Sequence, residues 1–221
     1  MIDIAITFPT RGRPDNVRRL VASVRATAST NPEIIIYVDD DDTSYLGLDK
    51  ELNIIIQNGP RKTLSSCYND CVQKTSAEIL MFAGDDLLFR TQNWDLEIIN
   101  TFSKYPDKIV FVHGNDGHWE HRLGTHGFLH RKWVNAVGYF IPPFFGCDFS
   151  DVWITDVANA LGRKVYLSNI LIEHMHPAFG KADWDQTHKE RLARNDGGVL
   201  YNQLSSRRQD DILKLKGELH A

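Results

Sequence analysis

The sequence predicts an α/β fold in which a mostly parallel central sheet is flanked by helices. Short apolar runs rich in β-branched residues alternate along the chain with amphipathic stretches of helical spacing. The apolar runs are nearly continuous, which is typical of parallel strands that are covered on both faces. A length of 221 residues and an ordinary composition suit one domain, or one core with a C-terminal extension.

The first half is expected to alternate regularly between strands and helices. The expected strands are 2–8, 33–42, 52–58, 78–86 and 108–116, and the expected helices are 16–28, 63–75 and 94–105. In helix 16–28, apolar residues such as Val17, Leu20 and Val24 recur at helical spacing. Pro14 falls near the first turn of this helix, where its missing N–H costs little.

The second half is less regular. We expect a strand and then a short helix from near His130 within 124–140, a proline-aromatic loop over 141–149, a helix over 150–164, a strand over 165–177, and a loop and charged helix over 178–196. Ser150 and Gly162 are the expected N-cap and C-cap of helix 150–164. A polar terminal helix is expected over 199–219, packed on the surface or against a partner, so that it could support an oligomer.

Charge and cysteine content exclude several classes of function. The formal net charge of −4 makes no strong case for a nucleic-acid partner. Cys67, Cys71 and Cys147 form no disulfide framework, and we expect the first two to be buried as small apolar residues. No apolar run reaches about 18 residues and no signal peptide is visible, so we expect no membrane span and a cytoplasmic protein.

Polar clusters follow three of the predicted strands. They are Pro9-Thr10-Arg11, the acidic run 39–42 and Asp85-Asp86. Ligands of such sheets bind outside the carboxyl ends of the strands, so these clusters predict one shared site. No glycine-rich phosphate loop follows the first strand. The adjacent carboxylates repel each other and are costly to desolvate, so either a turn or a bound cation would explain the pair.

Several short motifs occur together in a recognisable order. They are FPTRGRPDN, IIIYVDDDD, CYND with MFAGDD, FSDVW and IEHMHP. In this order they resemble the GT-A glycosyltransferases, especially the inverting family 2-like group, over roughly residues 2–180. The stretch EHMHPAFGKADWD is similar to small glycosyltransferases encoded by bacteriophages. The chain departs from the family pattern in having Gly-Asp-Asp for the metal motif and Ser150-Asp151 for the usual Glu-Asp.

The resemblance implies a Rossmann-like nucleotide-diphospho-sugar transferase fold. Residues 1–116 would form the nucleotide-sugar half, 117–180 the acceptor and catalytic half of the same domain, and 181–221 a C-terminal helical extension. The implied activity is metal-dependent, inverting transfer from a nucleotide-diphosphate sugar, with a UDP-sugar favoured, to a hydroxyl on a modified DNA base, a protein or a glycan. A catalytically inactive binding domain and a sugar-phosphate nucleotidyltransferase are the alternatives.

The resemblance also assigns roles to residues. The nucleotide-sugar contacts would come from Pro9, Thr10, Arg11, Arg13, Asp39, Arg61, Asn69 and Asp85. Asp86 would hold Mn²⁺ or Mg²⁺ together with His174 or His176, which share one strand face and so are not separated by the sequence.

The catalytic base would be Asp151, with Asp148 as the second candidate. An acid in a first helical turn also stabilises the helix dipole, so Asp151 has a structural alternative. Trp153 and the aromatic residues of loop 142–145 would either stack on a sugar ring or belong to the core.

Overall fold

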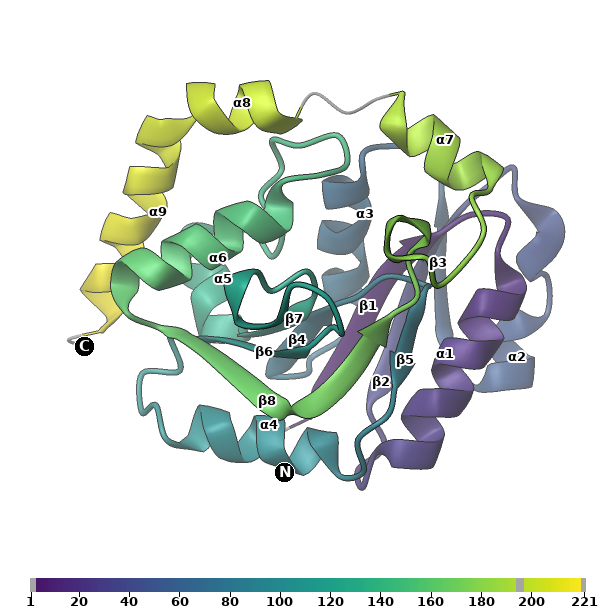
Figure 1. Ribbon diagram of the computed structural model, residues 1–221, viewed down its shortest axis with the longest axis horizontal. Coiled ribbons are helices and arrows are strands. Elements are labelled where there is room, and N and C mark those ends of the chain that lie inside the picture. The colour runs from purple at the N-terminus through teal and green to yellow at the C-terminus, as the bar shows by residue number, and fades with distance from the viewer. Residues whose placement is uncertain (1–2, 194–196, 220–221) are drawn as a thin grey trace.

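A curled, mixed sheet with helices on both faces runs through the molecule (Figure 1). The computed structural model describes residues 3–193 and 197–219. Its strands are β1 Ile4–Thr10, β2 Glu33–Asp39, β3 Ile55–Gly59, β4 Ile79–Phe82, β5 Leu87–Phe89, β6 Phe111–Asn115, β7 Gly127–His130 and β8 Lys164–His174. Its α-helices are α1 Pro14–Thr27, α2 Leu48–Leu52, α3 Leu64–Cys71, α4 Trp94–Ser103, α5 Arg131–Val137, α6 Ser150–Leu161, α7 Gln186–Leu192, α8 Gly197–Gln203 and α9 Ser205–Glu218.

The sheet has the strand order β3-β2-β1-β4-β7-β6-β8-β5 over the described residues. β1 runs parallel to β2 and β4, β3 runs parallel to β2, and β6 runs parallel to β8. Only β7, between β4 and β6, and β5, at the β8 edge, run against the others in this sheet. The predicted α/β class with a mostly parallel sheet is therefore confirmed, and most strands present their carboxyl ends at the same edge.

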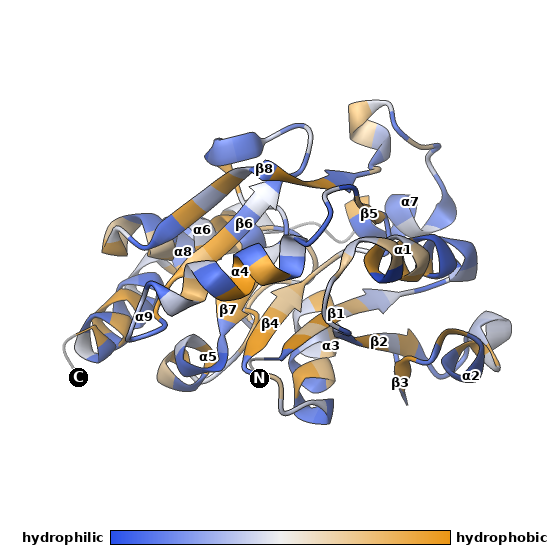
Figure 2. Ribbon diagram, turned by 90° about the horizontal axis from the view of Figure 1, so that it is seen from below, coloured by the Kyte–Doolittle hydropathy of each residue, from blue (hydrophilic) through white to orange (hydrophobic). Residues whose placement is uncertain are grey.

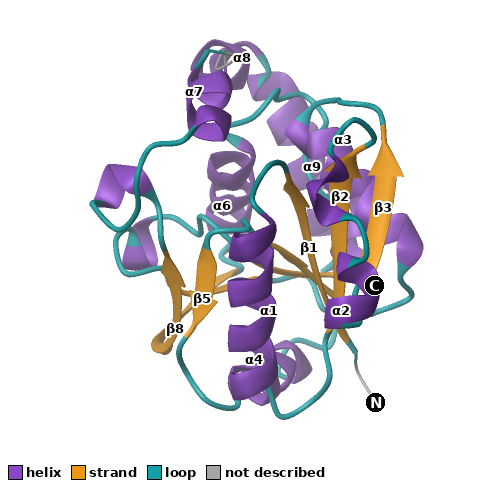
Figure 3. Ribbon diagram, turned by 90° about the vertical axis from the view of Figure 1, so that its right-hand side faces the viewer, coloured by secondary structure: helices purple, strands orange, loops and turns teal. Residues whose placement is uncertain are grey.

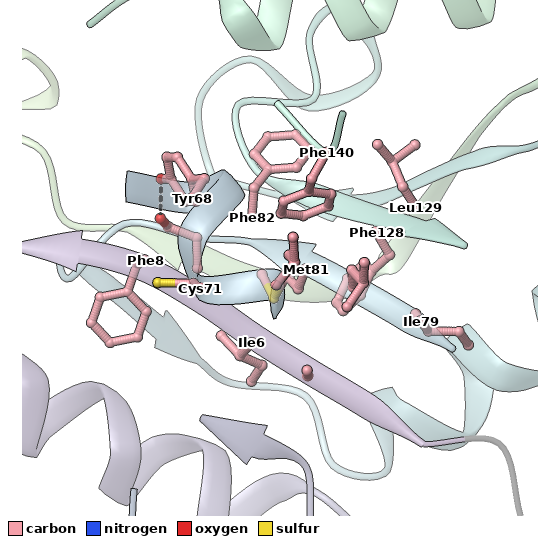
Figure 4. Packing of buried hydrophobic residues seen from close by; sticks show 14 of the residues in the cluster. Ile6, Phe8, Tyr68, Cys71, Ile79, Met81, Phe82, Phe128, Leu129 and Phe140 are labelled. Atoms are coloured by element: carbon pink, nitrogen blue, oxygen red, sulfur yellow. Dashed lines mark hydrogen bonds between the residues drawn. The ribbon is translucent and has the colours of Figure 1, made fainter. Parts of the chain in front are cut away.

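The core lies where β1 is enclosed by its neighbours and by helices on both sides. In register, Ile6 of β1 lies beside Ile34 of β2 and Met81 of β4. Figure 4 shows the side chains of these central strands packed together with the side of α3 that carries Tyr68 and Cys71. Both cysteines of α3 are buried and free, as predicted. This closely packed centre fixes the strand ends that build the site.

Helices cover both faces of the sheet and hold its edge in place. Figure 2 shows α1 and α4 on one side of the sheet and α3 and α5 on the other. Figure 3 shows α1 running along the sheet with α4 below it. Val17, Leu20 and Val24, the apolar residues predicted to face inward on the first helix, are fully buried on the inner face of α1. Within the described part of the chain, no helix has the length and apolar character needed to span a bilayer.

The C-terminal helix α9 packs against α5 and α6 of the same chain. Ile212 and Leu215 are buried in this contact. The carboxylate of Asp211, also buried, accepts hydrogen bonds from the hydroxyl of Tyr139 and from Nε1 of Trp153 at 3.0 Å. The apolar face of this helix is therefore used within the domain.

Several element boundaries differ from the sequence prediction. The expected strand 78–86 ends at Phe82, and Asp85-Asp86 form a turn that leads into β5. The sequence pattern did not predict β5, α2 or the other short elements. Because β5 pairs with β8 and not with β4, the turn does not make a hairpin. The expected helices 178–196 and 199–219 are α7 and the pair α8–α9. Residues 2 and 194–196 of the expected elements lie outside the described residues.

The predicted N-cap of α6 is wrong. Phe149 occupies that position, with φ +77°, and Ser150 is the first helical residue. The hydroxyl of Ser150 instead lies 3.4 Å from that of Ser65 on α3. Gly162 ends the helix in the left-handed conformation, as predicted.

Candidate active site

A cleft of about 550 Å³ lies at the carboxyl ends of the central strands. It is lined by nearly all of the site residues predicted from the sequence, which are Pro9, Thr10, Arg11, Arg13, Asp39, Arg61, Asp85, Asp86, Asp148, Asp151, His174 and His176. The parallel order of β1, β2 and β4 brings their three polar tips to this one place. The structure thus assembles in space what the sequence suggested from strand ends alone.

Asp39, at the end of β2, is surrounded by arginines. Nη1 of Arg11 lies 2.8 Å from Oδ2 of Asp39, and Nε of Arg61 lies 3.7 Å from the same oxygen. Arg11 also pairs with Asp41 through both of its terminal nitrogens, at 2.5 and 2.9 Å. A carboxylate between two guanidinium groups forms a polar corner that can accept from a base N–H and hold a phosphate nearby.

Asp85 anchors the loop that follows β1. Its Oδ2 accepts a hydrogen bond from Oγ1 of Thr10 at 2.7 Å, and its Oδ1 accepts one from Nη1 of Arg13 at 3.1 Å. Burial raises the pKa of Asp85, although the charge of Arg13 opposes the shift, and repulsion from Asp86 raises it further. This carboxylate therefore ties the tips of β1 and β4 together from inside the protein.

Asp86 faces His174 at the end of β8. Oδ2 of Asp86 lies 3.3 Å from Nε2 of His174. Although burial opposes the shift, the hydrogen bond and charge of His174 lower the pKa of Asp86, so the carboxylate is ionised. Gly84 makes room for this arrangement, because a Cβ at that position would lie 2.5 Å from Oδ1 of Asp86. The Gly-Asp-Asp sequence thus has a steric reason for lacking a first carboxylate.

The Asp86–His174 pair suits a divalent cation that takes its other ligands from substrate and water. A carboxylate oxygen from the turn between β4 and β5 and an imidazole nitrogen from the end of β8 converge there. Nδ1 of His174 is buried without a hydrogen-bond partner. Among the described residues, no three His, Cys, Asp or Glu side chains gather closely enough to hold a metal by themselves. Any cation here would depend on ligand oxygens as well.

His174 and His176 differ in their surroundings. Nδ1 of His176 accepts the backbone N–H of Ala178 at 3.1 Å and so begins the short 3-10 helix Pro177–Phe179. Nε2 of His176 lies 3.1 Å from Nη2 of Arg191. The structure therefore places His174 beside Asp86 and gives His176 a role in shaping the loop after β8.

Asp151 lies in the first turn of α6 and faces the cleft. Burial raises the pKa of Asp151 to about 6, and the nearby charge of Asp148 adds to the shift. Oδ1 of Asp151 accepts the N–H of Val152 at 2.9 Å. A carboxylate whose pKa lies near neutrality is suited to take a proton from a hydroxyl. Asp148 lies 3.6 Å from Nε of Arg191 and is thus closer to a cation than Asp151 is.

The helix α7 contributes side chains to the lining of the cleft that were not predicted from the sequence. Asp185, just before α7, pairs with Arg13 through two contacts of 2.6 Å. Oγ1 of Thr187 donates to the carbonyl of Arg11 at 3.1 Å, and Glu190 pairs with Arg61. Further cleft residues without a sequence signal are Tyr37, Lys62, His126, His188 and Arg191.

Two groups of sequence candidates do not reach the cleft as expected. Asn69 does not line it, because its amide binds the backbone of residues 140 and 141 and the carbonyl of Ser65. Trp153 is 1% exposed and Phe145 is fully buried, so they belong to the core. Of the two alternatives left open for these rings, the core position is the one observed, because Phe145 packs against Trp153 of α6.

Comparisons with known proteins agree with this architecture. The family model for Glycosyl transferase family 2 matches residues 5–184. No curated protein matches the chain significantly.

Solved structures with the same fold include S. aureus TarS, with a TM-score of 0.60 and 14% identity over 87% of this chain. The chain spans 43% of the length of that TarS structure. A TarS fragment, residues 1–349, in complex with UDP-GlcNAc is similar over 90% of this chain and 69% of the fragment, with a TM-score of 0.59 and 12% identity. The mannosyltransferase PcManGT from Pyrobaculum calidifontis, in complex with GDP-Man and Mn²⁺, is similar over 97% of this chain and 73% of that one, with a TM-score of 0.56 and 10% identity.

Proposed function

Because the chain belongs to glycosyltransferase family 2, we propose that it transfers a sugar, with inversion, from a nucleotide-diphosphate donor to an acceptor hydroxyl. The observation that carries this proposal is the convergence of Asp39, Asp86, His174 and Asp151 on one cleft. A UDP-sugar is the favoured donor, because Asp39 can accept from the N–H of uracil. The solved TarS complex with UDP-GlcNAc belongs to a protein of the same fold.

The proposed nucleotide site lies at the β1–β2 side of the cleft. Asp39 would bind the base, while Arg11 and Arg61, which already contact its carboxylate, would turn toward the diphosphate. Arg13, in the loop after β1, would add a third positive charge near the diphosphate. Asp85 would act from behind by holding Thr10 and Arg13 in position.

Asp86 and His174 would hold a divalent cation, Mn²⁺ or Mg²⁺. A bound cation would neutralise the charge of the departing diphosphate. The PcManGT structure, which contains GDP-Man and Mn²⁺, supports this choice of cofactor for a related fold.

Asp151 would act as the base on the acceptor side. As the acceptor oxygen forms its bond to the anomeric carbon, the proton of the hydroxyl passes to a carboxylate oxygen of Asp151. The bond from the anomeric carbon to the diphosphate oxygen breaks, and its electron pair leaves with the diphosphate. Attack from the face opposite the leaving group inverts the configuration. α7 would limit the access of water to the donor while this occurs.

The proposal extends to the acceptor and its biological setting. Residues 117–180 would supply the acceptor side. If the stretch EHMHPAFGKADWD reflects the phage resemblance expected from the sequence, the acceptor would be one relevant to a phage in the host cytoplasm. A modified DNA base, a protein and a glycan all offer a suitable hydroxyl.

A donor-hydrolysis assay tests the function directly. The protein is incubated with a panel of nucleotide sugars with and without Mn²⁺, and nucleoside diphosphate release is measured. We expect Mn²⁺-dependent release from a UDP-sugar. In a parallel incubation with a nucleoside triphosphate and a sugar 1-phosphate, release of pyrophosphate would instead indicate a nucleotidyltransferase. Absence of nucleoside diphosphate release from every donor would contradict the proposal.

A further inference from the structure

Two loops form an aromatic wall at the end of the cleft away from β2. The wall consists of His118 and Trp119, after β6, and Phe179, after β8. The rings of His118 and Phe179 stack with their centroids 3.8 Å apart and an interplanar angle of 18°. The ring of Trp119 meets His118 edge-on at 5.2 Å. Trp119 and Phe179 line the cleft, so the wall is one of its sides.

A buried carboxylate holds the loop that carries Trp119. Asp116 is 2% exposed, and its Oδ1 accepts the backbone N–H groups of residues 118, 119 and 120 at 2.7 to 3.0 Å. Its Oδ2 accepts the hydroxyl of Thr125 at 3.0 Å. This loop is therefore positioned by several hydrogen bonds to one group and presents Trp119 in a defined orientation.

Trp119 keeps part of its indole accessible. The residue is 36% exposed, whereas the core residue Trp153 is 1% exposed. The guanidinium of Arg122 lies over the indole, 5.1 Å from the ring centroid, and also donates to the carbonyl of His118. One face is thus supported from within the loop, and the remaining ring surface is available to a ligand in the cleft.

The wall lies on the acceptor side of the candidate base. β2, which carries Asp39, is separated from β6 by β1, β4 and β7, roughly 19 Å along the sheet at the usual strand spacing. The same loop is tied to α6, because the N–H of Gly124 donates to Oγ1 of Thr155 at 3.3 Å. α6 begins with the turn that carries Asp151. A molecule on the wall would therefore lie toward α6, whose first turn carries Asp151, and away from the corner around Asp39.

We propose that the aromatic wall binds a carbohydrate acceptor, with the C–H face of a sugar ring against Trp119 and a hydroxyl directed to Asp151. This inference rests on the proposed function and specifies the acceptor class. A sugar ring has an apolar face for the indole and hydroxyls for the flanking carboxylates. A DNA acceptor would bring phosphates toward Asp148 and Asp151 on a chain of net charge −4, which is unfavourable.

The test measures acceptor use and donor cleavage separately. Wild type is assayed with the best nucleotide sugar and a panel of methyl glycosides and disaccharides of glucose, galactose and N-acetylglucosamine, with single-stranded oligonucleotides and peptides as competing acceptors. We expect transfer to a saccharide. In Trp119→Ala the KM for that saccharide should rise at least tenfold, while donor hydrolysis without acceptor stays within twofold of wild type.

Two further variants separate a binding surface from a general loss of structure. Trp119→Phe keeps an aromatic face and should recover most of the saccharide affinity. Leu96→Ala truncates an exposed apolar residue on α4, outside the cleft, and should change neither activity. Saccharide binding is measured independently by tryptophan fluorescence in the presence of UDP, where Trp119→Ala should lose most of the wild-type change.

The failures of the two proposals are distinguishable. An unchanged saccharide KM in Trp119→Ala, or transfer by wild type to oligonucleotides or peptides alone, would overturn the carbohydrate assignment while leaving a working glycosyltransferase. Absence of donor cleavage and of transfer in wild type would overturn the proposed function and this inference together.

Discussion

Asp85 and Asp86 are adjacent in the sequence and have different surroundings. Asp85 contacts Thr10 and Arg13 and holds the β1 loop, while Asp86 contacts His174 at the end of β8. Side chains that leave a turn in opposite directions explain how two carboxylates can be buried side by side. Each has its own hydrogen-bond partner, which offsets part of the cost of desolvation.

We predict that Asp86→Ala abolishes transfer while leaving the fold intact. The variant loses the carboxylate proposed to hold the cation, so donor cleavage should fall at least about 100-fold. Release of nucleoside diphosphate is measured over a Mn²⁺ titration, with circular dichroism as the check on folding. Asp40→Ala, at an exposed acid near the β2 tip, is the control and should behave like wild type. Full activity of Asp86→Ala under chelator would refute the role.

The raised pKa of Asp151 predicts a pH profile. The carboxylate is the active form of a base, so kcat/KM should rise with pH through about 6 and then level off. Asp151→Asn cannot take a proton, and its transfer rate should fall by about 100-fold or more. A pH-independent rate between pH 5 and 8 in wild type would contradict this assignment.

The same shift has a consequence for stability with a defined sign. The pKa of Asp151 is raised on folding, so its ionisation disfavours the folded state. This cost is absent below the ordinary aspartate pKa, grows as the pH rises toward about 6, and is fully present above that pH. Asp151→Asn avoids the cost. Its melting temperature should therefore exceed that of wild type at pH 8, by a margin that shrinks at pH 5. Thermal unfolding at both pH values measures the difference, and equal margins would contradict the raised pKa of Asp151.

At the scale of elements, the strand tips and the helix near residue 190 were predictable from the sequence, but the position of that helix, α7, at the cleft was not. Asp39, Asp85 and Asp86 follow apolar strands, so local patterning places them at the sheet edge. By contrast, Arg13 and Asp185 meet across 172 positions of sequence. The charged pattern around residue 185 is equally typical of a solvated helix, and only the tertiary fold brings it over the cleft. For the same reason Trp119, in a loop rich in charged and histidine residues, gave no sign of lining the site.

We predict that α7 contributes to donor binding through Asp185. This residue caps α7 by accepting the N–H of His188 at 2.9 Å, and it pairs with Arg13. Asp185→Ala removes a cap worth about 1 kcal/mol together with the link to the nucleotide loop. The KM for the donor should rise several-fold to about tenfold, and limited proteolysis near α7 should accelerate. Asp183→Ala, two positions earlier and exposed, is the matched control. Identical donor kinetics in both variants would show that α7 covers the cleft without assisting binding.

At the scale of the whole molecule, the sheet order explains why one cleft can hold both substrates. Continuous burial of the strands predicted the α/β class, because only a two-sided covering of helices accommodates such runs. The order of the strands in the sheet could not be predicted from the sequence, because β5 directly follows β4 in the chain but pairs with β8 at the edge of the sheet. The pairing of β5 with β8 brings His174 next to Asp86. The carboxyl ends of β6 and β8 lie at the same edge of the sheet as those of β1 and β2, several strands away.

The C-terminal helix should be integral to the stability of the domain. Asp211 of α9 accepts from both Tyr139 and Trp153, and Asp211→Ala would leave the buried Trp153 N–H and the half-buried Tyr139 hydroxyl without this acceptor. An unsatisfied buried donor costs about 1–3 kcal/mol, so we expect a net loss of roughly 2 kcal/mol in the free energy of unfolding, reduced by relief of the buried charge. Asp211→Asn keeps an acceptor oxygen and should lose less, and the exposed Asp210→Ala should lose almost nothing. Urea denaturation followed by circular dichroism ranks the three variants. Because Trp153 lies on α6 two residues from Asp151, Asp211→Ala should also slow transfer. Equal stability of all three variants would mean that the contacts of Asp211 do not hold α9 to the domain.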